Sequence, residues 1–93
     1  MEITKNTKVR RSKNQEHNYL DDEVVMLNVE DCNMYNFNEV GTRIWELLED
    51  KVFSVEELAL KLIKEFDVFK EDCINDIILF VKDISKKGLL EIA

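Results

Sequence analysis

The spacing of the apolar residues changes at Asn38, and this change limits what the chain can fold into. Between Gln15 and Phe37 the apolar residues are mainly β-branched or aromatic, and polar turn residues separate them into short runs. The runs are Tyr19-Leu20, Val24 to Val29 and Met34 to Phe37. Tyr35 shares one face with Phe37 in the last run, and we expect that face to be core. The front of the chain therefore predicts three short antiparallel strands.

From Asn38 onward the apolar residues recur with the 3.6-residue period of an α-helix. Asn38 is a good N-cap for a first helix. Ser54 and Glu57 form a capping box at the start of a second helix, which we expect to end near Asp67.

A third helix is predicted from about Lys70 to Lys87. Gly88 follows it in the C′ position, and the chain then becomes extended from Leu89 to Ile92. The order predicts one α+β domain over residues 1–93, in which an N-terminal three-stranded antiparallel sheet precedes a three-helix bundle resembling a winged helix-turn-helix. We assign five apolar residues to its core: Trp45, Leu48, Leu58, Leu62 and Val81.

Several function classes are disfavoured by what the chain lacks. Its longest apolar run, Ile77 to Val81, is far shorter than the roughly 18 residues that span a bilayer. Residues 1–11 show no secretory signal, so we expect a cytoplasmic protein without a membrane partner. His17, expected on an exposed strand, and two cysteines in no CxxC pattern predict no metal site. Without a serine elbow or a glycine-rich phosphate loop, we expect a binding protein that has no cofactor and is not an enzyme.

Charge is distributed unevenly along the chain. Residues 1–15 carry five basic residues against one acidic residue, whereas residues 16–93 carry 8 basic against 19 acidic residues. The net charge of −7 repels phosphate backbones, and the third helix has as many acidic as basic residues, so nucleic acid is disfavoured as a partner. We expect the basic N-terminal stretch to be a frayed end, with a contact arm as the alternative.

The third helix has more apolar surface than a helix on one side of a core needs. Its apolar arc is about 160° wide, against roughly 100° for an ordinary surface helix. Phe80 lies at the margin of this arc, whereas Ile77 and Ile84 lie near its centre. Two interpretations stay open: the helix packs on two sides, or one edge of it contacts a partner.

Three segments carry a resemblance to a known family. They are NEVGTRIWELLED from Asn38 to Asp50, the VEEL that begins at Val55, and KGLLEI from Lys87 to Ile92. In this order and spacing the chain closely resembles the coenzyme PQQ synthesis protein D family, over almost its whole length. The resemblance implies a stand-alone RiPP recognition element, a small domain that captures the leader of a ribosomally made precursor peptide. It presents that leader to a modifying enzyme, commonly a radical S-adenosylmethionine enzyme.

The resemblance also implies where the leader binds, namely as an added strand between the edge of the N-terminal sheet and the third helix. On the sheet side it points to the backbone of Cys32, Asn33, Met34, Tyr35 and Asn36. On the helix side it points to Cys73, Asp76, Ile77, Phe80 and Ile84, of which Ile77 and Ile84 are also expected in the core. Two other functions stay open, a winged-helix DNA-binding regulator and a structural subunit of a protein complex, and so does a homodimer.

Overall fold

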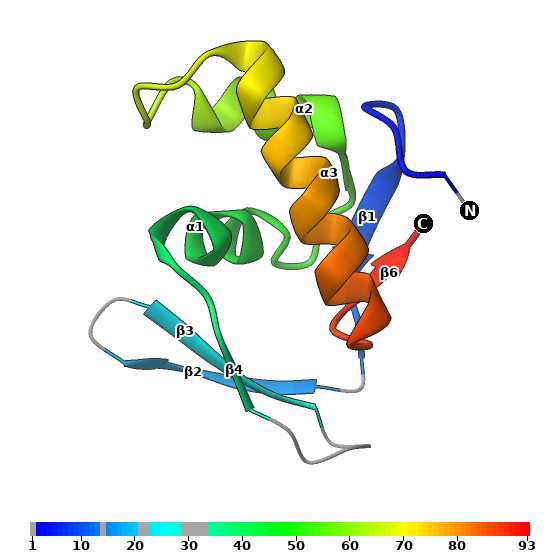
Figure 1. The fold of residues 1–93 in the computed structure, drawn as a ribbon. Coiled ribbons are helices and arrows are strands. Elements are labelled where there is room, and N and C mark those ends of the chain that lie inside the picture. The colour runs from blue at the N-terminus through cyan, green and yellow to red at the C-terminus, as the bar shows by residue number, and fades with distance from the viewer. Residues whose placement is uncertain (1, 14, 21–22, 29–33) are drawn as a thin grey trace.

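The computed structural model describes residues 2–13, 15–20, 23–28 and 34–93, and its elements form two small sheets and a helical layer (Figure 1). The elements are β1 (Lys8–Arg11), β2 (Gln15–Leu20), β3 (Glu23–Asn28), β4 (Met34–Asn36), α1 (Glu39–Leu47), β5 (Phe53–Ser54), α2 (Val55–Leu62), α3 (Lys70–Lys86) and β6 (Leu90–Ile92). The first sheet has the order β2-β3-β4 and the second sheet the order β5-β1-β6. The helix α1 lies between the first sheet and α2, and α3 runs along the side of both helices.

The sheet β2-β3-β4 confirms the three antiparallel strands predicted for the front of the chain. Met26 lies opposite Tyr35 in the register, and Val25 lies opposite Asn36. Met26 and Phe37 are buried and Tyr35 is half-buried, so the face that Tyr35 and Phe37 share does pack on the core. The α+β class is therefore confirmed.

The second sheet corrects the expectation of a frayed N-terminus. The strand β1 lies in the middle of this sheet, antiparallel to both β5 and β6. Val9 pairs with Phe53 on one side and Ile92 on the other, and its side chain is completely buried. Because Val9 is the only apolar residue among four in β1, the sequence pattern was too weak to indicate a strand.

The predicted starts of the first two helices are confirmed by their caps. The Asn38 side chain accepts the Gly41 N–H at 2.8 Å, and Ser54 and Glu57 form the reciprocal bonds of a capping box. Hydrogen bonding to Ser54 lowers the pKa of the Glu57 carboxyl.

In the described chain, no helix is both long and apolar enough to cross a membrane.

The end of the second helix differs from the prediction, whereas the end of the third helix agrees with it. The second helix, α2, ends at Leu62 instead of near Asp67, because the backbone hydrogen bonds tighten there to the i−3 spacing of a turn. The Lys64 N–H bonds to the Lys61 carbonyl at 3.3 Å, and the Glu65 N–H bonds to the Leu62 carbonyl at 3.0 Å. The third, α3, ends at Lys86 as expected, and Gly88 follows with a φ of 75°. That left-handed conformation favours glycine and agrees with the predicted C′ position.

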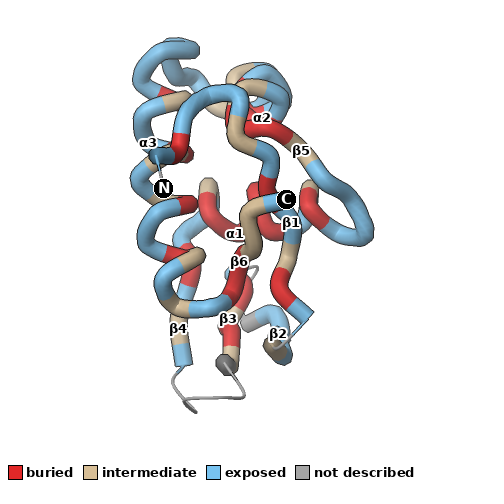
Figure 2. Tube along the Cα trace, turned by 90° about the vertical axis from the view of Figure 1, so that its right-hand side faces the viewer, coloured by how far each residue is buried: buried red, intermediate tan, exposed pale blue. Residues whose placement is uncertain are grey.

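The core is centred on Trp45 of α1, which has no exposed surface. The Arg11 guanidinium lies 4.4 Å from the centre of its ring, and the Phe37 ring meets it edge-on at 6.1 Å. In Figure 2 the buried parts of α1, β1 and β3 lie in the middle of the molecule, with exposed segments around them. The other four residues assigned to the core are each at most 1% exposed: Leu48, Leu58, Leu62 and Val81.

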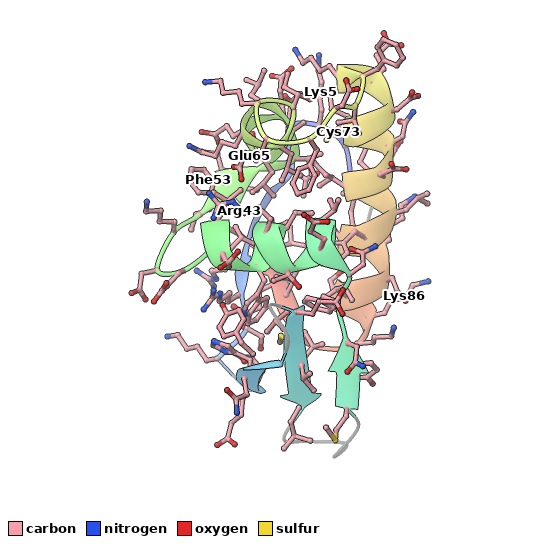
Figure 3. All side chains as sticks on the ribbon, turned by 90° about the vertical axis from the view of Figure 1, so that its left-hand side faces the viewer. Lys5, Arg43, Phe53, Glu65, Cys73 and Lys86 are labelled. Carbon is pink, nitrogen blue, oxygen red and sulfur yellow. The ribbon has the colours of Figure 1, made fainter. Side chains whose placement is uncertain are left out.

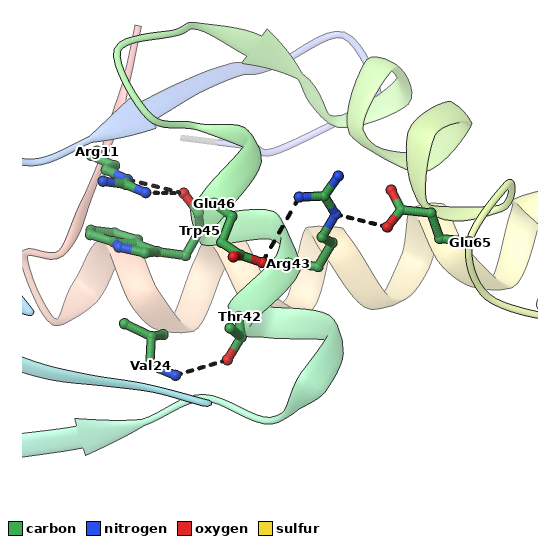
Figure 4. A network of polar contacts seen from close by, with 7 residues as sticks. All are labelled: Arg11, Val24, Thr42, Arg43, Trp45, Glu46 and Glu65. Carbon is green, nitrogen blue, oxygen red and sulfur yellow. Dashed lines mark hydrogen bonds and ion pairs between the residues drawn. The ribbon is translucent and has the colours of Figure 1, made fainter. Parts of the chain in front are cut away.

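Thr42 joins α1 to the first sheet (Figure 4). Its hydroxyl accepts the Val24 N–H at 3.1 Å and donates to the Phe37 carbonyl at 3.4 Å. The Phe37 N–H in turn donates to the Val24 carbonyl at 3.1 Å. One buried hydroxyl therefore completes the hydrogen bonding between β3 and the residue that follows β4.

We expect Thr42→Val to destabilise the protein by about 1–3 kcal/mol, because it leaves the buried Val24 N–H without an acceptor. Thr42→Ser keeps the hydroxyl and is the matched control. Urea denaturation of the three proteins measures the difference. Equal stability of the valine and serine variants would show that the hydroxyl bond contributes nothing.

Candidate functional site

The strand β4 forms one edge of its sheet, and no strand among the described residues pairs with its outer side. The Phe37 N–H points to β3, where it meets the Val24 carbonyl. Backbone groups alternate in direction along an antiparallel strand, so those of Tyr35 also point to β3. The N–H and C=O groups of Met34 and Asn36 consequently point away from β3, along the outer edge.

The C-terminal half of α3 lies beside this edge (Figure 3). Between the two elements is a hollow of about 170 Å³, which we call the β4–α3 groove. It is lined by Tyr35, Asn36, Phe37, Asn38, Phe80, Asp83, Ile84 and Lys87. The Lys87 ammonium lies 4.8 Å from the centre of the Tyr35 ring and 3.0 Å from the Asp83 carboxylate.

A second cavity of about 220 Å³, which we call the helical pocket, lies among the three helices. Its lining is mostly apolar: Asn38, Val40, Gly41, Ile44, Leu62, Phe66, Val68, Cys73, Asp76, Ile77 and Phe80. It lies beside the N-terminal half of α3 and the start of α1. Figure 3 marks this part of α3 with Cys73.

Phe80 belongs to the lining of both cavities and separates them. Its ring meets the Phe37 ring edge-on at 5.2 Å between centres. A Cβ atom on Gly41 would lie only 3.0 Å from the Phe80 ring, so a side chain at position 41 would push Phe80 away. Glycine at position 41 thus permits the close approach of α1 and α3 at this point.

The structure brings most of the predicted site residues into these two cavities. Tyr35, Asn36, Phe80 and Ile84 line the β4–α3 groove, and Cys73, Asp76 and Ile77 line the helical pocket. Ile77 and Ile84 are buried to 1% and 4% exposure, which confirms that they also belong to the core.

The predicted edge residues differ in whether their backbone groups or their side chains face the site. Met34 offers its backbone to the outer edge, but its side chain is 69% exposed and lies with Leu27 on the opposite face of the sheet. Tyr35 has the reverse arrangement, since its backbone points to β3 and its side chain lines the groove. Cys32 and Asn33 lie outside the described residues.

Sequence reasoning missed several lining residues. Asp83 and Lys87 follow Phe80 by three and seven positions, so helical periodicity could have placed them on its side of α3. Phe66 and Val68 lie between α2 and α3, where no periodicity indicates which way a side chain points.

The electrostatics of the helical pocket depend on Cys73 and Asp76. Burial raises the pKa of the Cys73 thiol, and the nearby Asp76 carboxylate raises it further. The thiol is therefore neutral at physiological pH and contributes apolar surface. The described residues contain no cluster of three histidine, cysteine or acidic side chains that could hold a metal ion. A strand edge that pairs with no other strand of the described residues, and that lies near a groove and an apolar pocket, is suited to bind an extended peptide.

Comparisons with known proteins agree on one family. The family model for coenzyme PQQ synthesis protein D (PqqD) matches residues 23–90. The solved structure of TbiB1 in complex with the TbiA(beta) leader peptide is 30% identical, with a TM-score of 0.81 over 88% of this chain and 94% of that chain. No curated protein matches the chain.

Two further solved structures share the fold at lower identity. A lasso peptide synthetase B1 complexed with its leader peptide is 22% identical, with a TM-score of 0.78 over 89% of this chain and 96% of that chain. The PqqD truncation of Methylobacterium extorquens PqqCD, a stand-alone RiPP recognition element, is 16% identical, with a TM-score of 0.79 over 96% of this chain and 94% of that chain.

Proposed function

Because the chain belongs to the coenzyme PQQ synthesis protein D family, we propose that it is a recognition element for ribosomally made precursor peptides. In this role it binds the leader of the precursor as an added strand on β4, beside α3. It then presents the bound peptide to a modifying enzyme. The domain itself binds and does not catalyse.

The observation that carries this proposal is the outer edge of β4, with the β4–α3 groove beside it. Met34 and Asn36 each offer one N–H and one C=O to an added strand. Each such hydrogen bond contributes about 0.5–1.5 kcal/mol, and each apolar side chain buried in a cavity about 1.5–3 kcal/mol. Since association costs about 4 kcal/mol or more, we expect micromolar to submicromolar dissociation constants.

The partner enzyme and the cellular compartment are proposed from what the family resemblance implies. A radical S-adenosylmethionine protein is the modifying enzyme that we propose as the partner, and the cytoplasm is the proposed compartment. We propose residues 1–93 as one domain that serves this single purpose. The complexes of TbiB1 and of lasso peptide synthetase B1 with leader peptides support the peptide-binding part.

A titration of isotope-labelled protein with the N-terminal half of a precursor peptide encoded beside this chain tests the proposal. We expect saturable backbone amide shifts concentrated between Met34 and Phe37 and between Cys73 and Lys87. The C-terminal half of the same peptide is the control and should leave the spectrum unchanged. No shift at millimolar peptide, with and without the modifying enzyme, would contradict leader binding and favour a structural subunit.

A further inference from the structure

The two cavities beside α3 differ in charge, although each has one aspartate at its rim. Asp83, at the β4–α3 groove, is neutralised by Lys87 at 3.0 Å. Asp76, one heptad earlier and at the helical pocket, is in no salt bridge formed by the described part of the chain. The aspartate at the rim of the β4–α3 groove is therefore paired with a lysine. The aspartate at the rim of the helical pocket is paired with no basic side chain of the described residues.

Resting on the proposed function, we infer that the helical pocket selects a particular peptide chemistry. It takes a leader segment in which an apolar side chain enters the pocket and a lysine or arginine two positions away, on the same face of the extended peptide, pairs with Asp76. The β4–α3 groove, in contrast, takes a neutral side chain. The two cavities together would therefore distinguish one leader from another.

The apolar part of this preference follows from the lining of the pocket. Nine of its eleven lining residues are apolar or glycine, and the two others are Asn38 and Asp76. The Asn38 side chain is already engaged, because it accepts the Gly41 N–H at 2.8 Å. A polar or charged side chain inside the pocket would lose its water without gaining a hydrogen-bond partner.

The cationic part follows from the position of the Asp76 carboxylate. It raises the pKa of the Cys73 thiol, which lies within the pocket lining, so its field reaches the pocket. Asp76 is exposed, and a long lysine or arginine side chain can lay its stem on the apolar rim while its charge stays in water beside the carboxylate. The excess of acidic over basic residues in residues 16–93 favours a cationic ligand in the same way.

Peptide display tests the inference with random sequences, so the experiment does not depend on identifying the natural leader. A library of random extended peptides is selected on the wild-type protein, on Asp76→Lys and on Glu71→Lys. Glu71 is a matched control, because it is an exposed acidic residue of the same helix that lines neither cavity. We expect the wild type and Glu71→Lys to enrich an apolar residue with lysine or arginine two positions away. Asp76→Lys should enrich the same apolar residue with aspartate or glutamate two positions away.

Two matched peptides from that selection then give the size of the effect. One carries the selected lysine and the other carries glutamine in its place. We expect the lysine peptide to bind the wild type about fivefold more tightly, as a partly exposed ion pair allows, and the preference to vanish in Asp76→Lys. Enriched peptides with no cation preference, or with the same preference on all three proteins, would overturn the inference and leave the proposed function intact. Failure to enrich any peptide would instead overturn both.

Discussion

Replacement of Trp45 by alanine is expected to destabilise the protein by about 3–5 kcal/mol, which is a large part of the stability of a small domain. Trp45 is completely buried and lies against the Arg11 guanidinium, the Phe37 ring and the His17 ring. Its removal would leave a large cavity between β1, the first sheet and α1. Trp45 is the only tryptophan, so its replacement also removes the tryptophan fluorescence signal. Urea denaturation is therefore followed by circular dichroism, which measures the loss of stability. A loss below about 1 kcal/mol would show that the centre of the core lies elsewhere.

Trp45→Phe is the informative comparison. The Nε1 atom of Trp45 is buried and has no hydrogen-bond partner in the described structure. Phenylalanine keeps most of the ring and removes this unsatisfied donor, so part of the loss from the smaller ring is offset. We expect Trp45→Phe to cost less than half as much as Trp45→Ala.

The main architecture could be predicted because each element has a local signal. The change of period at Asn38, the capping box at Ser54 and the glycine at position 88 each depend on neighbouring residues only. The strand β1 has no such signal. It forms because Val9 is buried between β5 and β6, both of which lie more than 40 residues away in the sequence. Long-range pairing of this kind is not written in a four-residue pattern.

The candidate site could be predicted in part for the same reason. Helical periodicity placed Phe80 at the margin of the apolar arc of α3, and the structure shows it half-buried between the two cavities. The family resemblance pointed to the edge strand. Neither the periodicity nor the resemblance indicated which of Met34 and Tyr35 has its backbone groups on the outer edge, because that depends on the register of β4 against β3. Val68 lines the helical pocket only because of the way the chain turns after α2, and no local sequence pattern indicates that turn.

Replacement of Asn36 by proline is expected to weaken leader binding at least tenfold, or by about 1.4 kcal/mol, while the fold stays stable. Proline has no N–H, and its ring occupies the place where an added strand would approach. The N–H that it removes points along the outer edge of β4, where proline is tolerated. Amide shifts and thermal unfolding of the same sample separate the two effects. Unchanged affinity would show that the leader does not pair with β4.

Two control variants accompany this test. One separates the backbone contribution of Asn36 from that of its side chain, and the other separates the outer edge of β4 from the edge that pairs with β3. Asn36→Ala keeps the N–H, so it should bind leader within about twofold of the wild type if the backbone makes the contact. Tyr35→Pro removes an N–H that points toward Met26 on β3, so it should lower the unfolding temperature. Binding lost in Asn36→Pro but kept in Asn36→Ala, with stability lost only in Tyr35→Pro, is the combination that strand addition on the outer edge of β4 requires. A leader held only by side chains in the two cavities would bind Asn36→Pro and Asn36→Ala alike.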